Sequence, residues 1–253
     1  MEKGLSASQI KHIRSLQQKK FRAETSLFVV EGEKLVEEAL HSGFETEGVW
    51  YRDEIGEKAM ERISSLSSPS PVLAVVRQRK TSLGDISIEK GRLYLMLDGV
   101  KDPGNLGTII RLADWFGVSA VFCSQDCVEL YNPKTVQATM GAIFRVPVVY
   151  CSLSDVVSKA GAADIPVFGT FLDGIPVGSE FCRKASGGCI IVMGSESNGI
   201  SEELSSLISK QRHILIPSYD VSGKEKKAGL GEGSESMNVA TACAAILSLV
   251  RVK

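Results

Sequence analysis

Short apolar runs alternate with helix-like segments along the chain after Gly91. The runs have the length of strands and are continuously apolar, as in LYLML at 93–97 and GCIIVM at 188–193. Strands that are apolar on both faces are typical of a parallel sheet covered by helices, so we expect an α/β domain. The expected strands are 93–97, 120–122, 146–150, 166–170, 188–193 and 213–216, with helices at 106–116, 134–142, 152–161, 201–210 and 236–251.

The chain before this domain also mixes short strands and helices. Ser6 and Gln9 fit a capping box for a helix over 6–18, in which apolar residues recur at helical spacing. The rest predicts a βαβαβ order and hence a small parallel or mixed sheet, followed by a polar joining segment at 77–91. The strands are expected at 27–30, 48–51 and 71–76, with helices at 32–41 and 56–63.

Composition limits the classes of protein that are compatible with the chain. Its 253 residues suffice for one large domain or two small ones, and its formal net charge of −1 means that any nucleic-acid binding depends on local patches. No apolar run approaches the roughly 20 residues of a membrane span, and the N-terminus lacks the apolar core of a secretory signal. The six cysteines form no CxxC pair and the three histidines are far apart. We therefore expect a cytoplasmic protein with free thiols and no metal site.

Polar, glycine-containing segments follow three of the expected strands. They are DGVKDPGN at 98–105, GSESNG at 194–199 and PSYDV at 217–221. In parallel sheets, ligands bind outside the carboxyl ends of the strands, so these segments are the candidate site.

Each candidate residue in these segments also has a purely structural interpretation. Asn105 can cap the following helix, and Arg111, inside an apolar helical run, faces either solvent or a polar cleft. Glu196 either faces the crevice or is a solvated loop residue, while Ser201 fits the cap of the next helix. Ser236 or Asn238 can cap the last helix.

Two familiar nucleotide-binding motifs are incomplete. SGKE at 222–225 lacks the upstream glycine and the Ser or Thr of a phosphate loop, and GLGEGS at 229–234 follows no expected strand. A serine hydrolase is poorly supported because the chain has no GxSxG motif.

Two basic clusters lie in or beside the N-terminal part. A charge run is usually a solvated face, but these clusters are also the candidate electrostatic footprint for RNA. The candidate RNA-binding residues are Lys19, Lys20, Arg22, Arg77, Arg79 and Lys80.

Together, three segments resemble the signature motifs of the SpoU (TrmH-like) RNA ribose 2′-O-methyltransferases, a branch of the SPOUT superfamily. The segments are LDGVKDPGNLGTIIRLADWFG (97–117), IIVMGSESNGIS (190–201), and LIPSY with ESMNVATACAAIL (215–219 and 235–247). PKTVQATMGAIFRVPV (133–148) is similar to the linker region of that family, and 10–40 to its L30e-like substrate-binding domain.

The resemblance implies an L30e-like RNA-binding domain at 1–88 and a SpoU-type domain at 89–253 with a deep trefoil knot, an exception to the rule of unknotted chains. It also implies S-adenosylmethionine as cofactor and a homodimer with the active site at its interface. By position, the catalytic residues are Asn105, Arg111, Glu196, Ser236 and Asn238. The cofactor-binding residues are Gly194, Ile216 and Met237, with Thr170 as a further candidate.

Methyl transfer from a sulfonium to a ribose hydroxyl needs neither a metal nor a protein nucleophile, because the leaving group is a neutral thioether. The 2′-hydroxyl makes RNA the substrate, with rRNA favoured over tRNA by analogy. Two alternatives stay open: an RNA-binding or ribosome-assembly factor without turnover, and a methyltransferase acting on a base nitrogen. The lysine-containing segment 219–233 is longer than in the family, and is expected to be either a lid or a tolerated insertion.

Overall fold

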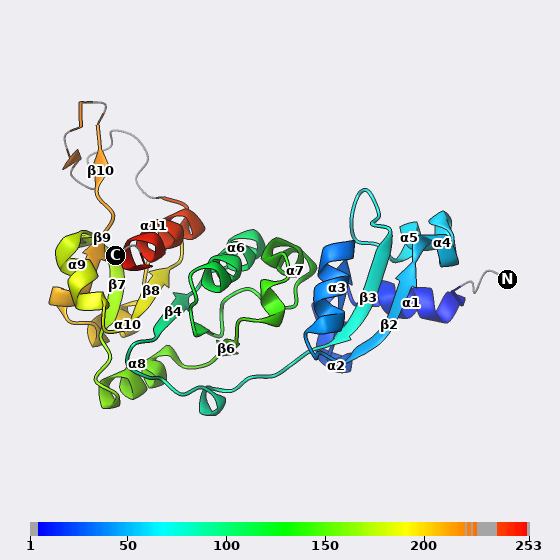
Figure 1. The fold of residues 1–253 in the computed structure, drawn as a ribbon, viewed down its shortest axis with the longest axis horizontal. Helices are drawn as coiled ribbons and strands as arrows, with labels where there is room; N and C mark the ends of the chain where they lie inside the picture. Colours follow the sequence, from blue (N-terminus) through cyan, green and yellow to red (C-terminus); the bar gives the residue numbers. More distant parts are fainter. Residues whose placement is uncertain (1–4, 221, 224, 227–236, 252–253) are drawn as a thin grey trace.

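The chain folds into two parts joined by an extended connection (Figure 1). The structure, a computed structural model, describes residues 5–220, 222–223, 225–226 and 237–251. The smaller N-terminal part contains a three-stranded sheet, and the larger C-terminal part contains a six-stranded sheet. Figure 1 places the two parts side by side along the long axis of the molecule.

The N-terminal sheet is antiparallel, with strand order β1-β3-β2. The prediction of a parallel or mixed sheet was therefore wrong in its pairing, because β3 runs between β1 and β2 and opposes both. Ser6 and Gln9 form the predicted capping box at the start of α1. The elements are α1 (Ala7–Ser15), α2 (Lys19–Thr25), β1 (Leu27–Glu31), α3 (Glu33–His41), β2 (Thr46–Tyr51), α4 (Arg52–Ile55), α5 (Glu57–Ile63) and β3 (Val72–Arg77).

The C-terminal sheet is parallel throughout, as predicted, with strand order β6-β5-β4-β8-β7-β9. All six strands therefore end at the same edge, which we call the carboxyl edge. The strands are β4 (Leu93–Asp98), β5 (Ala120–Cys123), β6 (Val148–Tyr150), β7 (Val167–Pro176), β8 (Cys189–Gly194) and β9 (His213–Leu215).

Helices cover both faces of this sheet. Leu93, Leu95 and Leu97 of β4 pack with α6, α9 and α11, whereas Tyr94 and Met96 face α8 and α10. This burial on both faces explains why the strands read as continuous apolar runs. The helices are α6 (Pro103–Trp115), α7 (Pro133–Thr139), α8 (Leu153–Ala162), α9 (Ser179–Ala185), α10 (Glu202–Leu207) and α11 (Val239–Arg251), with 3-10 turns η1 (Leu83–Asp85), η2 (Ala142–Phe144) and η3 (Lys210–Arg212).

Gly107 fixes the crossing of α6 and α7. A Cβ at this position would lie 2.5 Å from the Ala138 Cβ and 2.6 Å from the Thr135 carbonyl oxygen. Only glycine leaves room for so close an approach of the two helices. The start of α7 is thereby held beside the start of α6.

The two parts share one apolar core. The Phe28 ring of β1 lies 4.5 Å from the Tyr131 ring, centroid to centroid, and Phe44 packs edge-on against Phe144. Arg22 of α2 donates to both carboxylate oxygens of Glu129, at 2.9 and 2.7 Å. These contacts hold the N-terminal part against the segment that connects β5 to β6.

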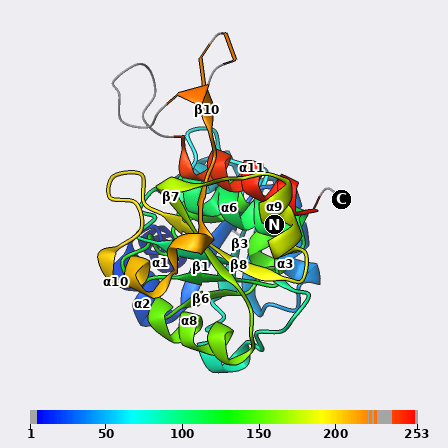
Figure 2. The same ribbon diagram turned by 90° about the vertical axis from the view of Figure 1, so that its left-hand side faces the viewer.

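Several elements differ from the sequence-based expectation. The helices α2 and α9 and the short hairpin of β10 (Ser218–Tyr219) and β11 (Glu225–Lys226) were not predicted. The strand expected at 166–170 continues to Pro176 after a register shift against β9. Figure 2 shows β10 projecting from the body of the domain. The structure describes only parts of the long segment 219–233, so its expected role as lid or insertion lies largely outside the described residues.

Candidate functional site

Asn105 lies in the first turn of α6, directly after the first strand-end segment. It is not the helix cap that one interpretation of the sequence predicted. Asp102 is the cap, and its side chain accepts a hydrogen bond from the Asn105 backbone nitrogen at 2.8 Å. Pro103 then occupies the first helical position, where no backbone donor is needed. The Asn105 side chain is consequently available for other contacts.

The Asn105 side chain joins the three strand-end motifs. Its Nδ2 donates to Glu196 Oε1, in the loop after β8. Its Oδ1 accepts from Asn238 Nδ2 at 2.9 Å. The Asn238 Oδ1 in turn accepts from the backbone nitrogens of Ala240 and Thr241, which caps α11. The structure thus brings together three of the five predicted catalytic residues in one hydrogen-bonded chain, Asn238–Asn105–Glu196, which we call the catalytic triplet after that prediction.

The loop that carries Glu196 is folded tightly against the carboxyl edge. Ser195 and Gly199 pair through both backbone hydrogen bonds. A Cβ on Gly194 would lie 2.2 Å from the Gly199 carbonyl carbon, so the glycine makes room for the loop itself. The Ser201 nitrogen donates to Asp98 Oδ2 at 2.8 Å, which ties the start of α10 to the end of β4. Asp98 was not singled out from the sequence, although its place at a strand end was a usable signal.

Arg111 lies six residues further along α6, about 9 Å from Asn105 along the helix axis. Its side chain is exposed. It makes no hydrogen bond or ion pair with any residue that the structure describes. Thr108 and Trp115 lie three and four positions from Arg111 and form one stripe of α6 with it, together with the neighbouring Leu112. Trp115 is 84% exposed. The structure therefore places Arg111 near the catalytic triplet on the same helix but not in contact with it.

The predicted cofactor residues come from the ends of neighbouring strands. Gly194 ends β8, Thr170 lies in the adjacent β7, and Ile216 follows β9 on the far side of β7. The Thr170 hydroxyl donates to the Val192 carbonyl at 3.0 Å, so it is already engaged within the sheet. Met237 precedes Asn238 and is 45% exposed. Ser236 lies outside the described residues.

The predicted RNA-binding cations differ in what they contact. Arg22 is 2% exposed and paired with Glu129, so its expected place on a basic surface was wrong. Arg77 pairs with Glu45 and Glu47, and Arg79 donates to the Gly43 carbonyl and lies over the Phe44 ring. The exposed residues Lys19, Lys20 and Lys80 retain cationic groups at the surface, Lys20 with a loose 3.9 Å contact to Glu24.

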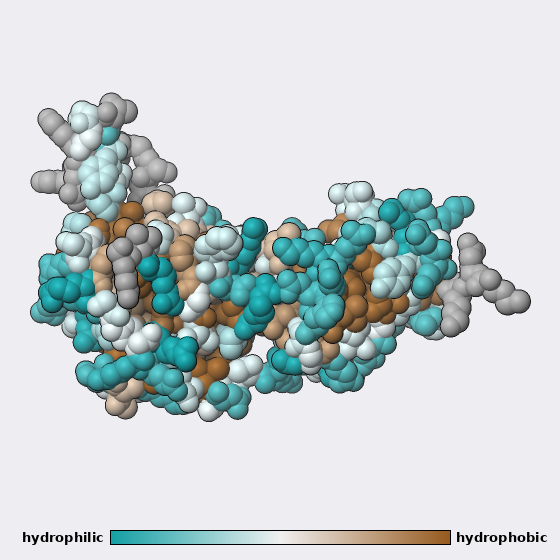
Figure 3. All heavy atoms as spheres, viewed as in Figure 1, coloured by the Kyte–Doolittle hydropathy of each residue, from teal (hydrophilic) through white to brown (hydrophobic). Residues whose placement is uncertain are grey.

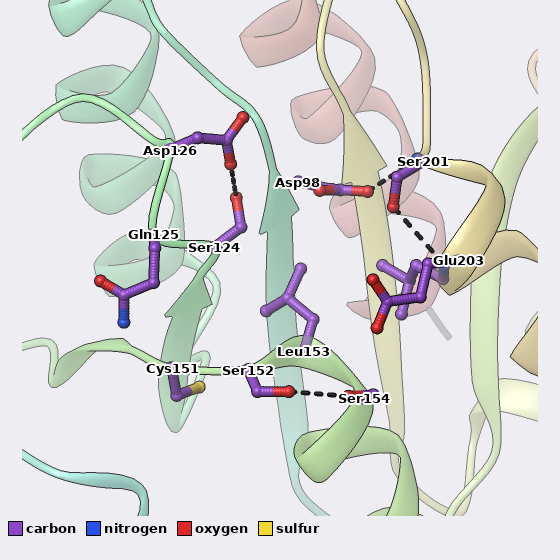
Figure 4. Close-up of a pocket in the computed structure, with 11 residues that line it drawn as sticks. Asp98, Ser124, Gln125, Asp126, Cys151, Ser152, Leu153, Ser154, Ser201 and Glu203 are labelled. Atoms are coloured by element: carbon purple, nitrogen blue, oxygen red, sulfur yellow. Dashed lines mark hydrogen bonds between the residues drawn. The ribbon is translucent and has the colours of Figure 1, made fainter.

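A hollow lies at the carboxyl edge, between the ends of β4, β5 and β6 (Figure 4). Its volume is about 250 Å³. We call it the carboxylate cleft because its charged lining residues are all acidic. They are Asp98, Asp126 and Glu203. In Figure 4, Asp98 is bonded to Ser201 and Asp126 to Ser124.

Cys127 lies beneath this edge and has a perturbed thiol. Its Sγ is in hydrogen-bond contact with Cys123, and also lies near Ser124 and the backbone of residues 99 and 100. These hydrogen bonds lower the pKa of Cys127 from its ordinary value of 9.0 to about 7. The same contact with Cys127, together with burial, raises the pKa of Cys123 well above its ordinary value.

The described residues hold neither a cluster of metal ligands nor a membrane-spanning helix. Within them, no three His, Cys, Asp or Glu side chains are grouped so that they could hold a metal ion. None of the described helices is long and apolar enough to cross a membrane.

Comparisons with known proteins agree with this geometry. Residues 92–223 match the model of the SpoU rRNA Methylase family, and residues 7–78 match that of the MRM3-like substrate binding domain. The chain is 30% identical over 257 residues to a 23S rRNA (guanosine(2553)-2′-O)-methyltransferase of Bacillus subtilis, covering 96% of this chain and 95% of that protein.

Solved structures have the same fold. An AdoMet-bound rRNA methyltransferase of Sinorhizobium meliloti is 32% identical, with a TM-score of 0.81 over 97% of this chain and 95% of that one. The SpoU methyltransferase AviRb of Streptomyces viridochromogenes, at 22% identity and a TM-score of 0.79 over 97% of both chains, supports the fold alone.

The fold and the site together define a two-domain α/β protein of the SPOUT type, with a substrate-binding domain ahead of its parallel sheet. The chain belongs to the SpoU rRNA methylase family.

Proposed function

We propose that this protein transfers a methyl group from S-adenosylmethionine to a ribose 2′-hydroxyl of ribosomal RNA. The relatives that match over nearly the whole chain are rRNA methyltransferases, one of them solved with AdoMet bound. The observation that carries the proposal is the catalytic triplet, which joins three distant strand-end motifs at the carboxyl edge through hydrogen bonds.

The residues of the edge fit this cofactor. Ile216 is partly buried and Met237 is exposed, so both can contact an apolar ring, and the loop from Gly194 to Gly199 presents backbone groups. The cofactor supplies an electrophilic methyl group on a sulfonium. On this proposal Gly194, Ile216 and Met237 bind it, with Thr170 behind them as part of the sheet.

The catalytic triplet orients the ribose. Asn105 uses one side-chain atom on Glu196 and the other on Asn238, which fixes the rotamer of its amide. A fixed amide beside the 2′-hydroxyl restricts the direction in which the hydroxyl oxygen can approach the methyl group. Ser236, outside the described residues, is assigned here only by its position in the motif.

Arg111 supplies positive charge. A guanidinium stays protonated in proteins, so Arg111 acts by stabilising the developing alkoxide or holding the neighbouring phosphate. Its side chain is exposed and has no partner in the part of the chain that the structure describes, so it can meet an RNA chain that reaches the edge.

The exposed stripe of α6 supports a homodimer. An indole that is 84% exposed is unusual on a monomer surface, and Trp115 shares its stripe with Leu112 and Arg111. On this proposal a second copy covers Trp115, and Arg111 lies at the border of the interface. Light scattering of a Trp115→Arg variant tests it: a monomer is expected, and an unchanged dimer would place the interface elsewhere.

Three further features belong to the proposal. The N-terminal unit, 1–88, holds the RNA, and the catalytic unit, 89–253, contains the trefoil knot typical of SPOUT folds. The family matches at 7–78 and 92–223 support this division. The proposal includes a cytoplasmic location, which is compatible with an rRNA substrate and with the six free cysteines.

Methyl-transfer assays test the function. Protein, tritiated S-adenosylmethionine and 23S rRNA transcript are incubated, and the modified nucleotide is mapped by mass spectrometry. Label on a ribose confirms the proposal. Label on a base nitrogen would indicate the alternative acceptor, and RNA binding without label would indicate an assembly factor.

A further inference from the structure

A second, larger hollow lies where the two domains meet. Its volume is about 750 Å³, and we call it the interdomain cleft. Figure 3 shows the surface hollowed between the two domains. One wall is formed by the N-terminal domain and the other by the starts of α6 and α7. The lining residues are Gln17, Ser65, Leu66, Ser67, Pro103, Asn132, Pro133, Lys134, Gln137 and Ala138.

The cleft and the catalytic triplet both include residues at the start of α6. Pro103, which lines the cleft, is the first residue of that helix, and Asn105 follows two positions later. Gly107 locks α7 against α6, so Lys134 and Gln137 are held at a fixed place relative to Asn105. Side chains two positions apart point to nearly opposite sides of a helix, so an RNA chain lying in the cleft would have to pass around the start of α6 to reach Asn105.

The charge of the cleft suits an anion. Lys134 is exposed, and its ammonium group has no partner among the residues that the structure describes. No described lining residue carries a carboxylate. The carboxylate cleft at the sheet edge has the opposite lining, with Asp98, Asp126 and Glu203 and no cation. Of the two hollows, only the interdomain cleft attracts a phosphate chain.

Side-chain amides that line the same cleft have donors or acceptors without a hydrogen-bond partner among the described residues. Among the described residues the Gln137 side chain makes no hydrogen bond. Asn132 accepts a bond from the Lys134 backbone nitrogen through Oδ1 and retains its Nδ2 donors. Gln17 donates to the Ser64 carbonyl and retains its Oε1 acceptor. Amides with a free donor and acceptor match the edges of unpaired bases.

We propose that the interdomain cleft binds unpaired nucleotides of the RNA that carries the methylated one, with Lys134 on a phosphate and Gln137 and Asn132 on a base edge. This inference rests on the proposed function for the identity of its ligand as RNA. A volume of about 750 Å³ lies within the usual range of small-ligand pockets and is large enough for a nucleotide. Leu66 and the two prolines give the base an apolar surface to lie on.

The test compares four single variants with the full-length parent. Lys134→Gln removes the charge, and Gln137→Ala removes the amide. Ser67→Trp fills the cleft from the N-terminal wall without changing charge, and its neighbour Ser68 does not line the cleft, so Ser68→Trp is the matched control. Circular dichroism and thermal melting show which variants fold as the parent does.

Binding is measured by fluorescence anisotropy with mixed-sequence RNA octamers, single-stranded and duplex. We expect Lys134→Gln to weaken single-strand binding about threefold to tenfold and to reduce the salt slope by about 0.7, the value for one phosphate contact. We expect Ser67→Trp to weaken it at least as much, and Ser68→Trp to leave it unchanged. Gln137→Ala should alter the preference among oligonucleotides of single composition.

Wild-type affinity for single strands in both Lys134→Gln and Ser67→Trp would overturn the inference, as would equal losses on duplex RNA. Methyl transfer to 23S rRNA is assayed in parallel and separates the two proposals. A parent that methylates ribose while the variants bind normally disproves only the cleft assignment. Variants that lose single-strand binding while the parent transfers no methyl group disprove only the proposed function.

Discussion

The two domains use their polar residues differently. At the carboxyl edge of the C-terminal domain, Asn105, Glu196 and Asn238 are hydrogen-bonded to one another, whereas Arg111 has no partner among the described residues. In the N-terminal domain and the segment that follows it, three of the six predicted basic residues are engaged in the fold: Arg22 on Glu129, Arg77 on Glu45 and Glu47, and Arg79 on Gly43. The candidate site residues in the first region are linked across distant motifs, whereas half of the candidate cations in the second have a structural role.

The largest expected effect is the loss of turnover in Arg111→Ala, because Arg111, unlike the structural arginines, is not engaged in the described fold. Arg111→Ala should retain its fold and cofactor affinity, because the side chain is exposed and has no partner among the described residues. Turnover should fall by at least about 10²-fold, as is usual for a lost electrostatic stabiliser of a transition state. Arg212→Ala, an exposed arginine of the same domain, is the control. Near-normal methyl transfer by Arg111→Ala would remove it from the catalytic set.

The second prediction concerns Arg22, the structural counterpart. Glu129→Gln leaves the guanidinium of Arg22, which is 2% exposed, without its anionic partner. Loss of one member of a buried pair costs about 3 kcal/mol, so the midpoint of urea unfolding should fall clearly. Glu45→Gln, at the exposed Arg77 pair, should cost less than about 1 kcal/mol. Equal effects of the two substitutions would show that burial of Arg22 contributes nothing.

The third prediction separates structure from catalysis within one residue. Asn238 caps α11 through Oδ1 and holds Asn105 through Nδ2. Asn238→Asp keeps the capping oxygen but places an oxygen against Asn105 Oδ1. Stability should therefore stay near that of the parent while turnover falls about tenfold, the order of a lost hydrogen bond of about 1.4 kcal/mol. Asn238→Ala should lose both stability and turnover. A fully active Asn238→Asp would show that the hydrogen bond to Asn105 is dispensable.

Some of these contacts could be predicted from the sequence and others could not. The segments that carry Asn105 and Glu196 were found because strand ends of a parallel sheet share an edge, and that geometry follows from the apolar pattern. Asn238 and the roles of all three residues came from the resemblance to the SpoU family. The role of Asn105 as a helix cap was wrong because Asp102, three residues earlier, competes for the same position. No sequence pattern links Arg22 to Glu129, which are 107 positions apart.

The N-terminal sheet shows a similar limit. Short strands separated by helices predict a parallel or mixed order, but the connections of this domain bring β3 back between β1 and β2 in the opposite direction. A charge run likewise does not indicate where each side chain points. In α2, Lys19 and Lys20 are exposed while Arg22 turns into the core.

The fourth prediction concerns the cations that stay at the surface. Replacing Lys19 and Lys20 together by Gln should weaken RNA binding and reduce its salt slope by about 1.4 to 1.8, the value for two phosphate contacts. Arg77→Gln should leave the slope unchanged, because its charge is already balanced by Glu45 and Glu47. Filter binding at several salt concentrations measures both. A slope that changes only in Arg77→Gln would reverse the assignment of the two groups.

The smallest expected effect lies at the carboxyl edge, where hydrogen bonds stabilise the thiolate of Cys127 and lower its pKa to about 7. The thiol of the unfolded chain keeps its ordinary value of 9.0, so between these two values the unfolded state holds more protons. The unfolding free energy should therefore rise with pH across this window, by on the order of 1 kcal/mol. Cys123 does not cancel this rise. Its pKa in the folded protein is raised well above the ordinary value of 9.0, so its contribution to the unfolding free energy falls with pH mainly above 9. Urea unfolding at pH 7 and pH 8.5 should show the increase in the parent and not in Cys127→Ala. A parent whose stability falls over this range, relative to that variant, would mean that the edge does not stabilise the Cys127 thiolate.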